Sequence, residues 1–307
     1  MTLFTLGARN LLKRQIYQLP NTTNWTLSKT LPFFSLQLIQ NIHPPSLHKT
    51  TPNLYAKSKT LQFPARSLSS SSPAMISRDS KRTPWMPFYN NEADVIEQNM
   101  LDDGFRTWGL VIYRCTYKSN SDWEEFVSRF LHQVWSTLKD HDGLDMLDSF
   151  MPTVMDDKTQ FDGVTPYTVR DHFNKWASTA CEAEQGVPFT LAQWSNTARY
   201  GLCIMVEEEA LQSVLDIPLE ELDTYNETGF VILVNGRQEA ERGEEESDEL
   251  VEDDFEPLHG CTLEDVGWMK VRYGQAQIMG SAHMGNGFCW EREYRRPPQI
   301  GFNCLSW

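Results

Sequence analysis

The sequence predicts an α+β fold: a layered sandwich in which one mixed or antiparallel sheet carries helices on one face, with a ferredoxin-like arrangement as the preferred topology. Three observations support it. Strand-like apolar runs alternate with amphipathic helical patterns from residue 105 onward. Aromatic residues make up 12% of the 307 residues, enough to supply a core. No apolar run approaches the ~20 residues that a membrane-spanning helix needs, so an integral membrane protein is excluded.

The first strand and the first long helix have the clearest patterns. Residues Thr107 to Tyr117 are rich in β-branched and aromatic side chains and are apolar on both faces, as in a central strand covered on both sides. Ser121 and Glu124 then form a capping-box pattern at the start of a helix. Apolar residues recur at helical spacing from there to Lys139.

The later elements continue the alternation. A helix is expected to start at Thr165, as N-cap, with Pro166 at the first helical position. A short helix is expected to open on the acidic triplet 207–209, because acidic residues in a first turn complement the helix dipole. The expected strands are Leu144 to Val154, Arg199 to Val206, Gly229 to Asn235 and Val266 to Tyr273.

The charge distribution divides the chain into two parts. Residues 1–78 contain no acidic residue and nine basic ones, whereas the remainder holds 42 acidic and 18 basic residues. We therefore expect a disordered leader over 1–80 and a single domain over 85–300. The leader resembles a mitochondrial presequence, because its start is a cationic amphipathic helix; alternatively it is a gene-model extension and Met75 is the true start. The expected location is cytoplasmic, or mitochondrial if residues 1–74 are a genuine leader.

A second charge feature is an acidic stretch inside the domain. Residues 237–257 contain eleven acidic and two basic residues, so the sequence predicts a disordered, solvated loop between two strands. The acidic net charge argues against a general nucleic-acid binder, because binding to phosphates depends on Lys and Arg. None of the six cysteines forms a C-x-x-C pair. A reducing compartment without structural disulfides is the resulting expectation.

Eight blocks of sequence, among them those that contain GCTLEDVGWM at 260–269 and YRRPP at 294–298, stand in order along the domain. Together they resemble a family of fungal intracellular proteins of uncharacterised function. The blocks span nearly all of 85–298, and two of them, GCTLEDVGWM and YRRPP, make the resemblance specific. The resemblance implies a fungal, intracellular protein and carries no assigned catalytic or binding residue. Residues Gly274 to Trp290 depart from the family pattern, where an apolar strand and a Trp precede YRRPP. The blocks are WGLVIYRCTY, DW, LDMLDSF, FDG, VRDHFNKW, GFVILV, EPLHGCTLEDVGWMKV and YRRPP.

Four residues form the candidate polar site: Arg114, His172, His259 and Cys261. Arg114 lies on the Leu110 and Ile112 face of the first strand, so we expect a structural ion pair or, as the alternative, an anion site at the strand end. His172 flanks the apolar face of a helix, as a core histidine or a base. Gly260, Cys261 and Thr262 are expected to cap a turn before the last strand. The alternatives are a Cys261 nucleophile near His259 and Asp265, or a mixed metal site of His259 and Cys261 with Asp253 and Asp254.

Three functions remain open. No P-loop, G-x-G-x-x-G, G-x-S-x-G or H-E-x-x-H motif occurs, so the common nucleotide, hydrolase and zinc-protease frameworks are missing. The first function is therefore a non-catalytic interaction module with an unknown protein partner, no nucleic acid, no membrane, no cofactor and no metal. The second is an enzyme of unrecognised type near Arg114, His172 or Cys261. The third is a divalent-cation binder that uses the acidic loop.

Overall fold

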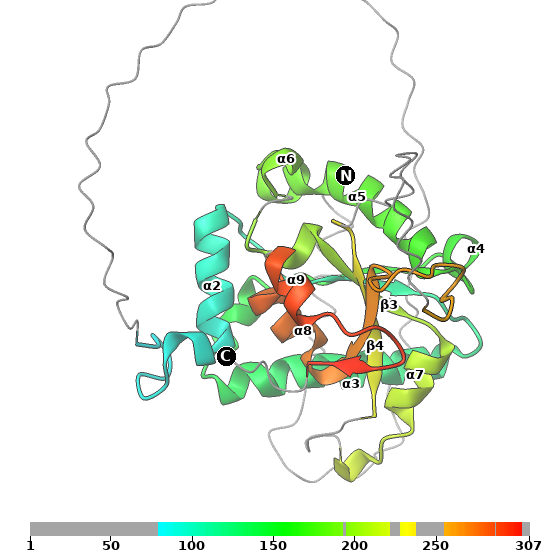
Figure 1. The fold of residues 1–307 in the computed structure, drawn as a ribbon. Helices are drawn as coiled ribbons and strands as arrows, with labels where there is room; N and C mark the ends of the chain where they lie inside the picture. The colour runs from blue at the N-terminus through cyan, green and yellow to red at the C-terminus, as the bar shows by residue number, and fades with distance from the viewer. Residues whose placement is uncertain (1–78, 193–194, 222–227, 238–254, 286, 303–307) are drawn as a thin grey trace, which may run out of the picture. The chain divides into compact units, whose positions relative to one another are not determined.

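A six-stranded mixed sheet runs through the centre of the fold (Figure 1). The computed structural model describes residues 79–192, 195–221, 228–237, 255–285 and 287–302. β1 is parallel to both β2 and β3, β4 is antiparallel to β3 and β5, and β6 is parallel to β5. In spatial order the strands are β2 (Thr153–Met155), β1 (Val111–Arg114), β3 (Leu202–Val206), β4 (Phe230–Asn235), β5 (Trp268–Arg272) and β6 (Ile300–Gly301).

Helices precede, connect and follow these strands. The predicted helix that begins after Thr165 is confirmed as α5, and the helix after the acidic triplet is confirmed as α7. The helices are α2 (Glu92–Asp103), α3 (Asn120–Asp140), α4 (Lys158–Phe161), α5 (Pro166–Gln185), α6 (Phe189–Ala192), α7 (Glu208–Leu215), α8 (Tyr273–His283) and α9 (Gly287–Glu293). Short 3-10 turns occur at Phe88–Asn90, Leu144–Asp148, Ala198–Tyr200 and Leu219–Glu221. Among the described residues, no helix combines the length and apolarity needed to cross a membrane.

The α+β class and the single mixed sheet are confirmed, but two finer expectations differ from the structure. The six-stranded order, with parallel β2-β1-β3 pairing, is not ferredoxin-like. Helices also cover both faces of the sheet rather than one (Figure 1). From β1 the chain steps outward to β2 and then back across β1 to β3. Right-handed crossovers that step in opposite directions place their helices, here α3 and α5, on opposite faces.

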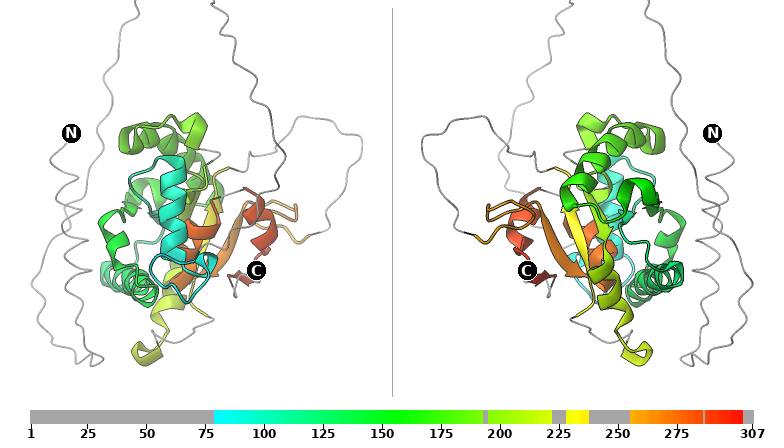
Figure 2. Two further views of the ribbon diagram at one scale, coloured as in Figure 1. Left: turned by 90° about the vertical axis from the view of Figure 1, so that its left-hand side faces the viewer. Right: turned by 90° about the vertical axis from the view of Figure 1, so that its right-hand side faces the viewer.

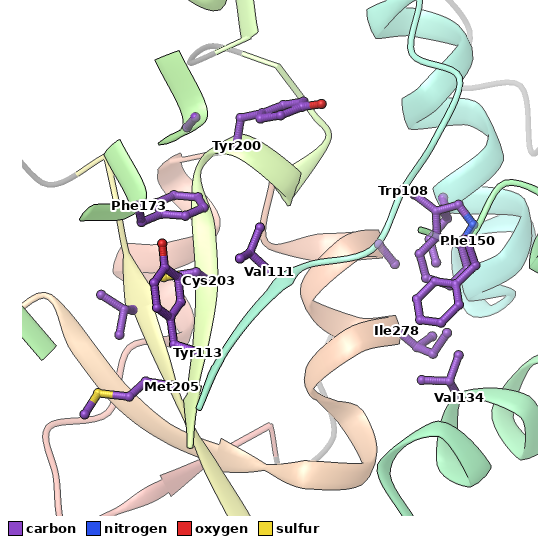
Figure 3. Close-up of a cluster of buried hydrophobic side chains, with 14 of the residues drawn as sticks. Trp108, Val111, Tyr113, Val134, Phe150, Phe173, Tyr200, Cys203, Met205 and Ile278 are labelled. Carbon is purple, nitrogen blue, oxygen red and sulfur yellow. The ribbon is translucent and has the colours of Figure 1, made fainter. Parts of the chain in front are cut away.

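Each face of the sheet has its own core. One face packs against α5, and Figure 3 shows Tyr113, Cys203 and Phe173 from this cluster. The other packs against α3, α7 and α8, through residues such as Phe126, Leu211 and Ala276. The apolar residues of β1 and β3, and those of β4 from Val231 onward, alternate between the two clusters. All residues of these three strands are buried, which explains why the strands read as nearly unbroken apolar runs.

The described fold begins at Asp79, before the boundary predicted at residue 85 and just inside the stretch predicted as a disordered leader. Ser80 is 3% exposed, and its hydroxyl donates to Asp94 on α2 at 2.5 Å. The backbone N–H of Lys81 and the guanidinium of Arg82 also bind this carboxylate. The segment therefore belongs to the packed domain. The rest of the predicted leader, up to residue 78, and most of the predicted acidic loop, 238–254, lie outside the described residues.

Of the helices that the sequence analysis did not predict, α2 and α8 matter for the core. α2 lies beside α8 (Figure 2). The side chain of Gln277 on α8 is 1% exposed and binds both backbone groups of Leu110, accepting from its N–H at 2.8 Å and donating to its carbonyl at 3.2 Å. α8 thus completes the hydrogen bonding of the chain just before β1. The segment that departs from the family resemblance forms part of the core rather than an appendage.

Candidate functional site

Arg114 lies at the end of β1 and is held by an internal network, which we call the Arg114 cluster. Its Nε donates to the Thr116 carbonyl at 3.0 Å and its NH2 donates to Asn120 at 2.7 Å. Its NH1 lies 3.4 Å from the carboxylate of Asp156, which follows β2. The Trp123 ring lies 5.2 Å away on the α3 side. The expected ion pair is confirmed, and the bound groups occupy each nitrogen of the guanidinium.

The Arg114 cluster sits where the two strand connections diverge. β1 leads into α3 on one face, and the neighbouring parallel strand β2 leads through α4 into α5 on the other. In open α/β sheets this divergence leaves a crevice where ligands bind. In this protein, the point of divergence is occupied by the side chains of Arg114, Asp156 and Tyr117. Burial, and next the charge of Asp156, raise the pKa of Tyr117, whose buried hydroxyl makes no hydrogen bond.

His172 lies on the opposite face of the sheet. Its Nδ1 is 2.9 Å from the Tyr113 hydroxyl, and its ring meets the edge of Phe161 with centroids 4.9 Å apart. Burial, and next the charge of Lys175, lower the pKa of His172. The histidine is therefore held neutral among aromatic rings, as the core interpretation of this residue predicts.

A tight turn is present at the predicted place, but it spans Leu258–Cys261 and so begins before the predicted cap Gly260–Thr262. Leu258 and Cys261 exchange both backbone hydrogen bonds at 3.0 Å. The two residues between them, His259 and Gly260, have φ values of 49° and 85°. Positive φ at both central positions is the geometry of a type I′ turn, which favours glycine. The exposed His259 ring lies 5.8 Å from the ring of Trp268, and Cys261 packs against the α5-side core.

The four predicted residues do not form one site. Arg114 faces the α3 side of the sheet, whereas His172, Cys261 and their neighbours belong to the α5 side. Among the described residues, no group of three or more His, Cys, Asp or Glu is arranged to hold a metal ion. The mixed metal site predicted for the turn also needs Asp253 and Asp254, which lie outside the described residues.

A second cluster, which the sequence reasoning missed, lies beside the turn. It consists of Tyr167, Arg170 and Trp268, and we call it the Arg170 cluster. The Arg170 carbon Cζ lies 5.5 Å from the centroid of the Tyr167 ring. Its NH2 donates to the Gly267 carbonyl at 2.6 Å, one residue before Trp268. Arg170 is 5% exposed and Trp268 is 4% exposed.

The Arg170 cluster contains buried donors without acceptors. Arg170 Nε, Trp268 Nε1 and the Tyr167 hydroxyl are all shielded from solvent and make no hydrogen bond. Cys261 and Trp268 lie close enough to the Tyr167 hydroxyl to act on its pKa, which Cys261 raises and Trp268 lowers, but neither meets it with the geometry of a hydrogen bond. Among the described residues, no carboxylate forms an ion pair with Arg170, whose only acceptors are the carbonyls of Val266 and Gly267.

The electrostatics of the Arg170 cluster follow from burial. Burial lowers the pKa of Arg170, although Asp265 and Asp171 oppose the effect from outside ion-pair distance. Burial, and next the Cys261 thiol, raise the pKa of Tyr167 to about 12. The cluster therefore presents one buried cation and two neutral donors at neutral pH. Unpartnered buried donors are uncommon in folded proteins and call for an explanation.

The sequence contains a signal for this cluster. Position 170 falls on the apolar stripe of α5, between the buried residues Val169 and Phe173. A charged residue within such a stripe is unusual, because burying a charge is costly unless it is paired. The sequence therefore shows that a charged residue interrupts the apolar stripe of α5. It does not show which residues surround Arg170, because β5 and the turn lie far along the chain.

The two blocks that make the family resemblance specific lie against each other. Trp290 donates its indole N–H to Asp265 at 2.7 Å, and the Tyr294 hydroxyl donates to the Glu264 carbonyl at 2.9 Å. Arg296 donates to the carbonyls of Leu263 and Glu256. Comparisons with models of protein families, with curated proteins and with solved structures find no match. The proposed fungal family thus stays a prediction.

Proposed function

We propose that this protein is a non-catalytic module that binds a basic protein partner through the acidic stretch 237–257. One observation carries the proposal: both described ends of this stretch are fixed to the fold by arginine side chains, while ten acidic residues and a single basic one stand between them in the sequence. An acidic segment whose ends are fixed to the fold is suited to attract a basic surface.

The two anchors are well defined. At the first, Arg237 extends its guanidinium to the Ser195 carbonyl at 3.2 Å, and its backbone N–H donates to Asn235 at the end of β4. At the second, Arg296 donates to the Glu256 carbonyl at 2.6 Å and lies 5.0 Å from the ring of Phe255. Arg237 lies two residues after β4 and Arg296 lies in the C-terminal block, so the acidic stretch begins and ends on fixed parts of the fold.

The placement of the polar candidates also favours binding over catalysis. Arg114 and His172 face opposite sides of the sheet, and each is already engaged with neighbours inside the protein. General acid–base and nucleophilic mechanisms need such groups within hydrogen-bond reach of one substrate position. The α5 side retains His172 and Cys261, but no interaction joins these two residues in the described structure.

The proposal is tested by changing the charge of the stretch without changing its length. In the neutralised variant, the ten acidic residues between 239 and 254 become Gln or Asn; in a matched control, the same residues are shuffled and the charge is kept. Both proteins and the wild type are used as bait at about 0.05 to 0.3 M salt, the range over which the screening length falls to below ~10 Å.

We expect wild type and the shuffled control to retain the same basic protein at low salt and to release it as salt is raised. The neutralised variant is expected to lose it at every salt concentration. Retention of that partner by the neutralised variant would contradict the proposal. Unchanged circular dichroism and melting temperature would show that the substitutions leave the fold intact, because the changed residues all lie outside the described core.

We further infer that the module works in a reducing compartment, with the cytoplasm as the first choice and the mitochondrial matrix if residues 1–74 are a leader. All five cysteines in the described part of the chain are free thiols. Cys115, Cys181 and Cys203 are buried among apolar side chains, where they act as small hydrophobic residues. Burial raises the pKa of Cys115 to about 12, which keeps it protonated.

A further inference from the structure

Within the described residues, the Arg170 cluster gathers three buried polar atoms that make no hydrogen bond. Other buried arginines in the described chain, such as Arg199 and Arg114, reach a carboxylate. Arg170 is equally buried but reaches only backbone carbonyls, and two further donors beside it, from Tyr167 and Trp268, also lack acceptors. A guanidinium, an indole N–H and a phenol that gather without an acceptor are arranged to receive one.

We propose that Tyr167, Arg170 and Trp268 form a binding site for the carboxylate of a small organic acid. The guanidinium supplies the charge, and the indole N–H and the phenol supply neutral hydrogen bonds to the same oxygens. Charge-assisted bonds to a carboxylate are about twice as strong as neutral ones, so Arg170 is the main determinant of binding.

Burial and charge favour a monocarboxylate over phosphate. A second negative charge adds a large desolvation cost in a site where the donor atoms are hidden from solvent. The chain from residue 79 onward also carries 42 acidic against 18 basic residues, which repels a dianion more strongly than a monoanion. The rings of Tyr167, Trp268 and His259 surround the donors and suit an acid with a flat apolar body.

The turn Leu258–Cys261 provides the side of approach. His259 and Gly260 are exposed and Cys261 is half-buried, and this turn lies beside the Trp268 ring and the Tyr167 hydroxyl. On the other side the cluster is backed by α5 and the apolar core. We therefore expect the carboxylate to approach the donors from the side of this turn.

The test uses the full chain with benzoate, acetate and inorganic phosphate as probes, at equal ionic strength and neutral pH. Binding is measured by calorimetry and by the shift in melting temperature. Arg170→Met removes the charge, and Tyr167→Phe and Trp268→Phe each address one neutral donor. Arg295→Met, at an exposed arginine that bonds only nearby carbonyls, is the control with the same change in net charge.

We expect benzoate to bind more tightly than acetate and to raise the melting temperature of wild type and of Arg295→Met alike. Arg170→Met is expected to abolish the response, and each Phe substitution is expected to weaken binding up to about tenfold, as for the loss of one hydrogen bond. Without ligand, Arg170→Met should melt no lower than wild type, because replacing a buried unpaired charge by an apolar side chain removes a desolvation cost.

Three results would overturn the proposal. The first is the absence of any carboxylate response in wild type, or the same response in Arg170→Met. The second is a response to phosphate that exceeds the response to benzoate, which would assign another class of ligand. The third is a marked loss of stability in unliganded Arg170→Met, which would make Arg170 a structural residue. Should Arg170→Met fail to fold, unaltered benzoate binding in both Phe variants would equally reject the site.

Discussion

At the scale of single residues, the buried arginines show how differently a charge can be satisfied. Arg199 is 1% exposed, and its guanidinium is fully engaged: it pairs with Glu184 at 2.9 Å and donates to the carbonyls of Gly109 and Met151. It ties the chain before β1 and β2 to the turn before β3. Arg170 has a similar exposure but lacks such a set of acceptors, so the two residues have opposite expected roles.

Arg199→Met is expected to destabilise the protein by about 3–5 kcal/mol, because it leaves the half-buried Glu184 and two buried carbonyls without their donor. The measurement is the free energy of unfolding from urea denaturation. Lys81→Met is the comparison, since the Lys81 side chain is 64% exposed in its pair with Glu97. An exposed pair of this kind contributes about 0–1 kcal/mol. Equal losses in the two variants would contradict the structural role of Arg199.

At the scale of elements, the helix N-caps show which helix starts could be predicted from the sequence and which could not. Thr165 and Pro166 start α5 as predicted, with Thr165 accepting from the Thr168 N–H. The predicted capping box of α3 is wrong by two residues: Ser119, not Ser121, is the N-cap. Ser119 has the extended backbone of an N-cap and accepts from the Asp122 N–H at 3.2 Å. Because Ser119 and Ser121 are only two residues apart, the sequence pattern allowed either of them as the N-cap of α3.

Ser119→Ala is expected to lower the free energy of unfolding by about 1 kcal/mol, because it removes the acceptor for an otherwise unpaired N–H in the first turn of α3. Ser121→Ala serves as the matched control and is expected to change it by less than about 0.5 kcal/mol, as for a surface substitution. Urea denaturation of both variants gives the comparison. A larger loss in Ser121→Ala would place the cap where the sequence pattern first suggested it.

The pairing of α2 with the end of α3 gives a pH dependence. His141 Nε2 lies 2.6 Å from Glu92, with both side chains largely buried. Burial opposes both charges, but the mutual hydrogen bond and attraction outweigh it, so the pKa of His141 is raised and that of Glu92 is lowered. Asp140 adds to the rise for His141, and His283 adds to the fall for Glu92.

The directions of the two pKa shifts determine how the stability contributed by the pair changes with pH. The contribution of His141 is complete below its ordinary pKa of 6.5 and is lost as the pH rises through its raised value. The contribution of Glu92 is complete above its ordinary 4.5 and is lost as the pH falls through its lowered value. The difference in unfolding free energy between wild type and His141→Gln should therefore be largest between these limits and shrink at higher pH. A difference that grows from pH 6 to pH 9 would contradict the pairing.

At the scale of the whole molecule, local signals were predictable and long-range ones were not. The strands around β1, β3, β4 and β5 were placed because they are continuous apolar runs. The same runs are apolar on both faces, which indicates that both sides of the sheet are covered. The prediction of helices on one face only was therefore inconsistent with the pattern of the strands. α8 was missed because its apolar residues do not form a single stripe: it is buried nearly all round.

The candidate site was predictable only in part. A turn around Cys261 was expected, and so was the ion pair of Arg114, from its position in an apolar strand. The Arg170 cluster depends on residues from α5 and β5 that are separated by about a hundred positions in the chain, with no shared motif. Contacts of that range are set by how the strands are ordered in the sheet, and this order was the part of the fold that the sequence left open.

The side-chain amide of Gln277 has a consequence for biosynthesis. The backbone of Leu110, at the entrance to the first strand, obtains its hydrogen bonds from a residue that the ribosome adds 167 positions later. During translation, the backbone amide and carbonyl of Leu110 therefore remain bound to water until nearly the entire polypeptide has been synthesised. The domain therefore completes its architecture after synthesis rather than progressively from its N-terminus, and shortened chains that end before the last helices should be substrates for chaperones.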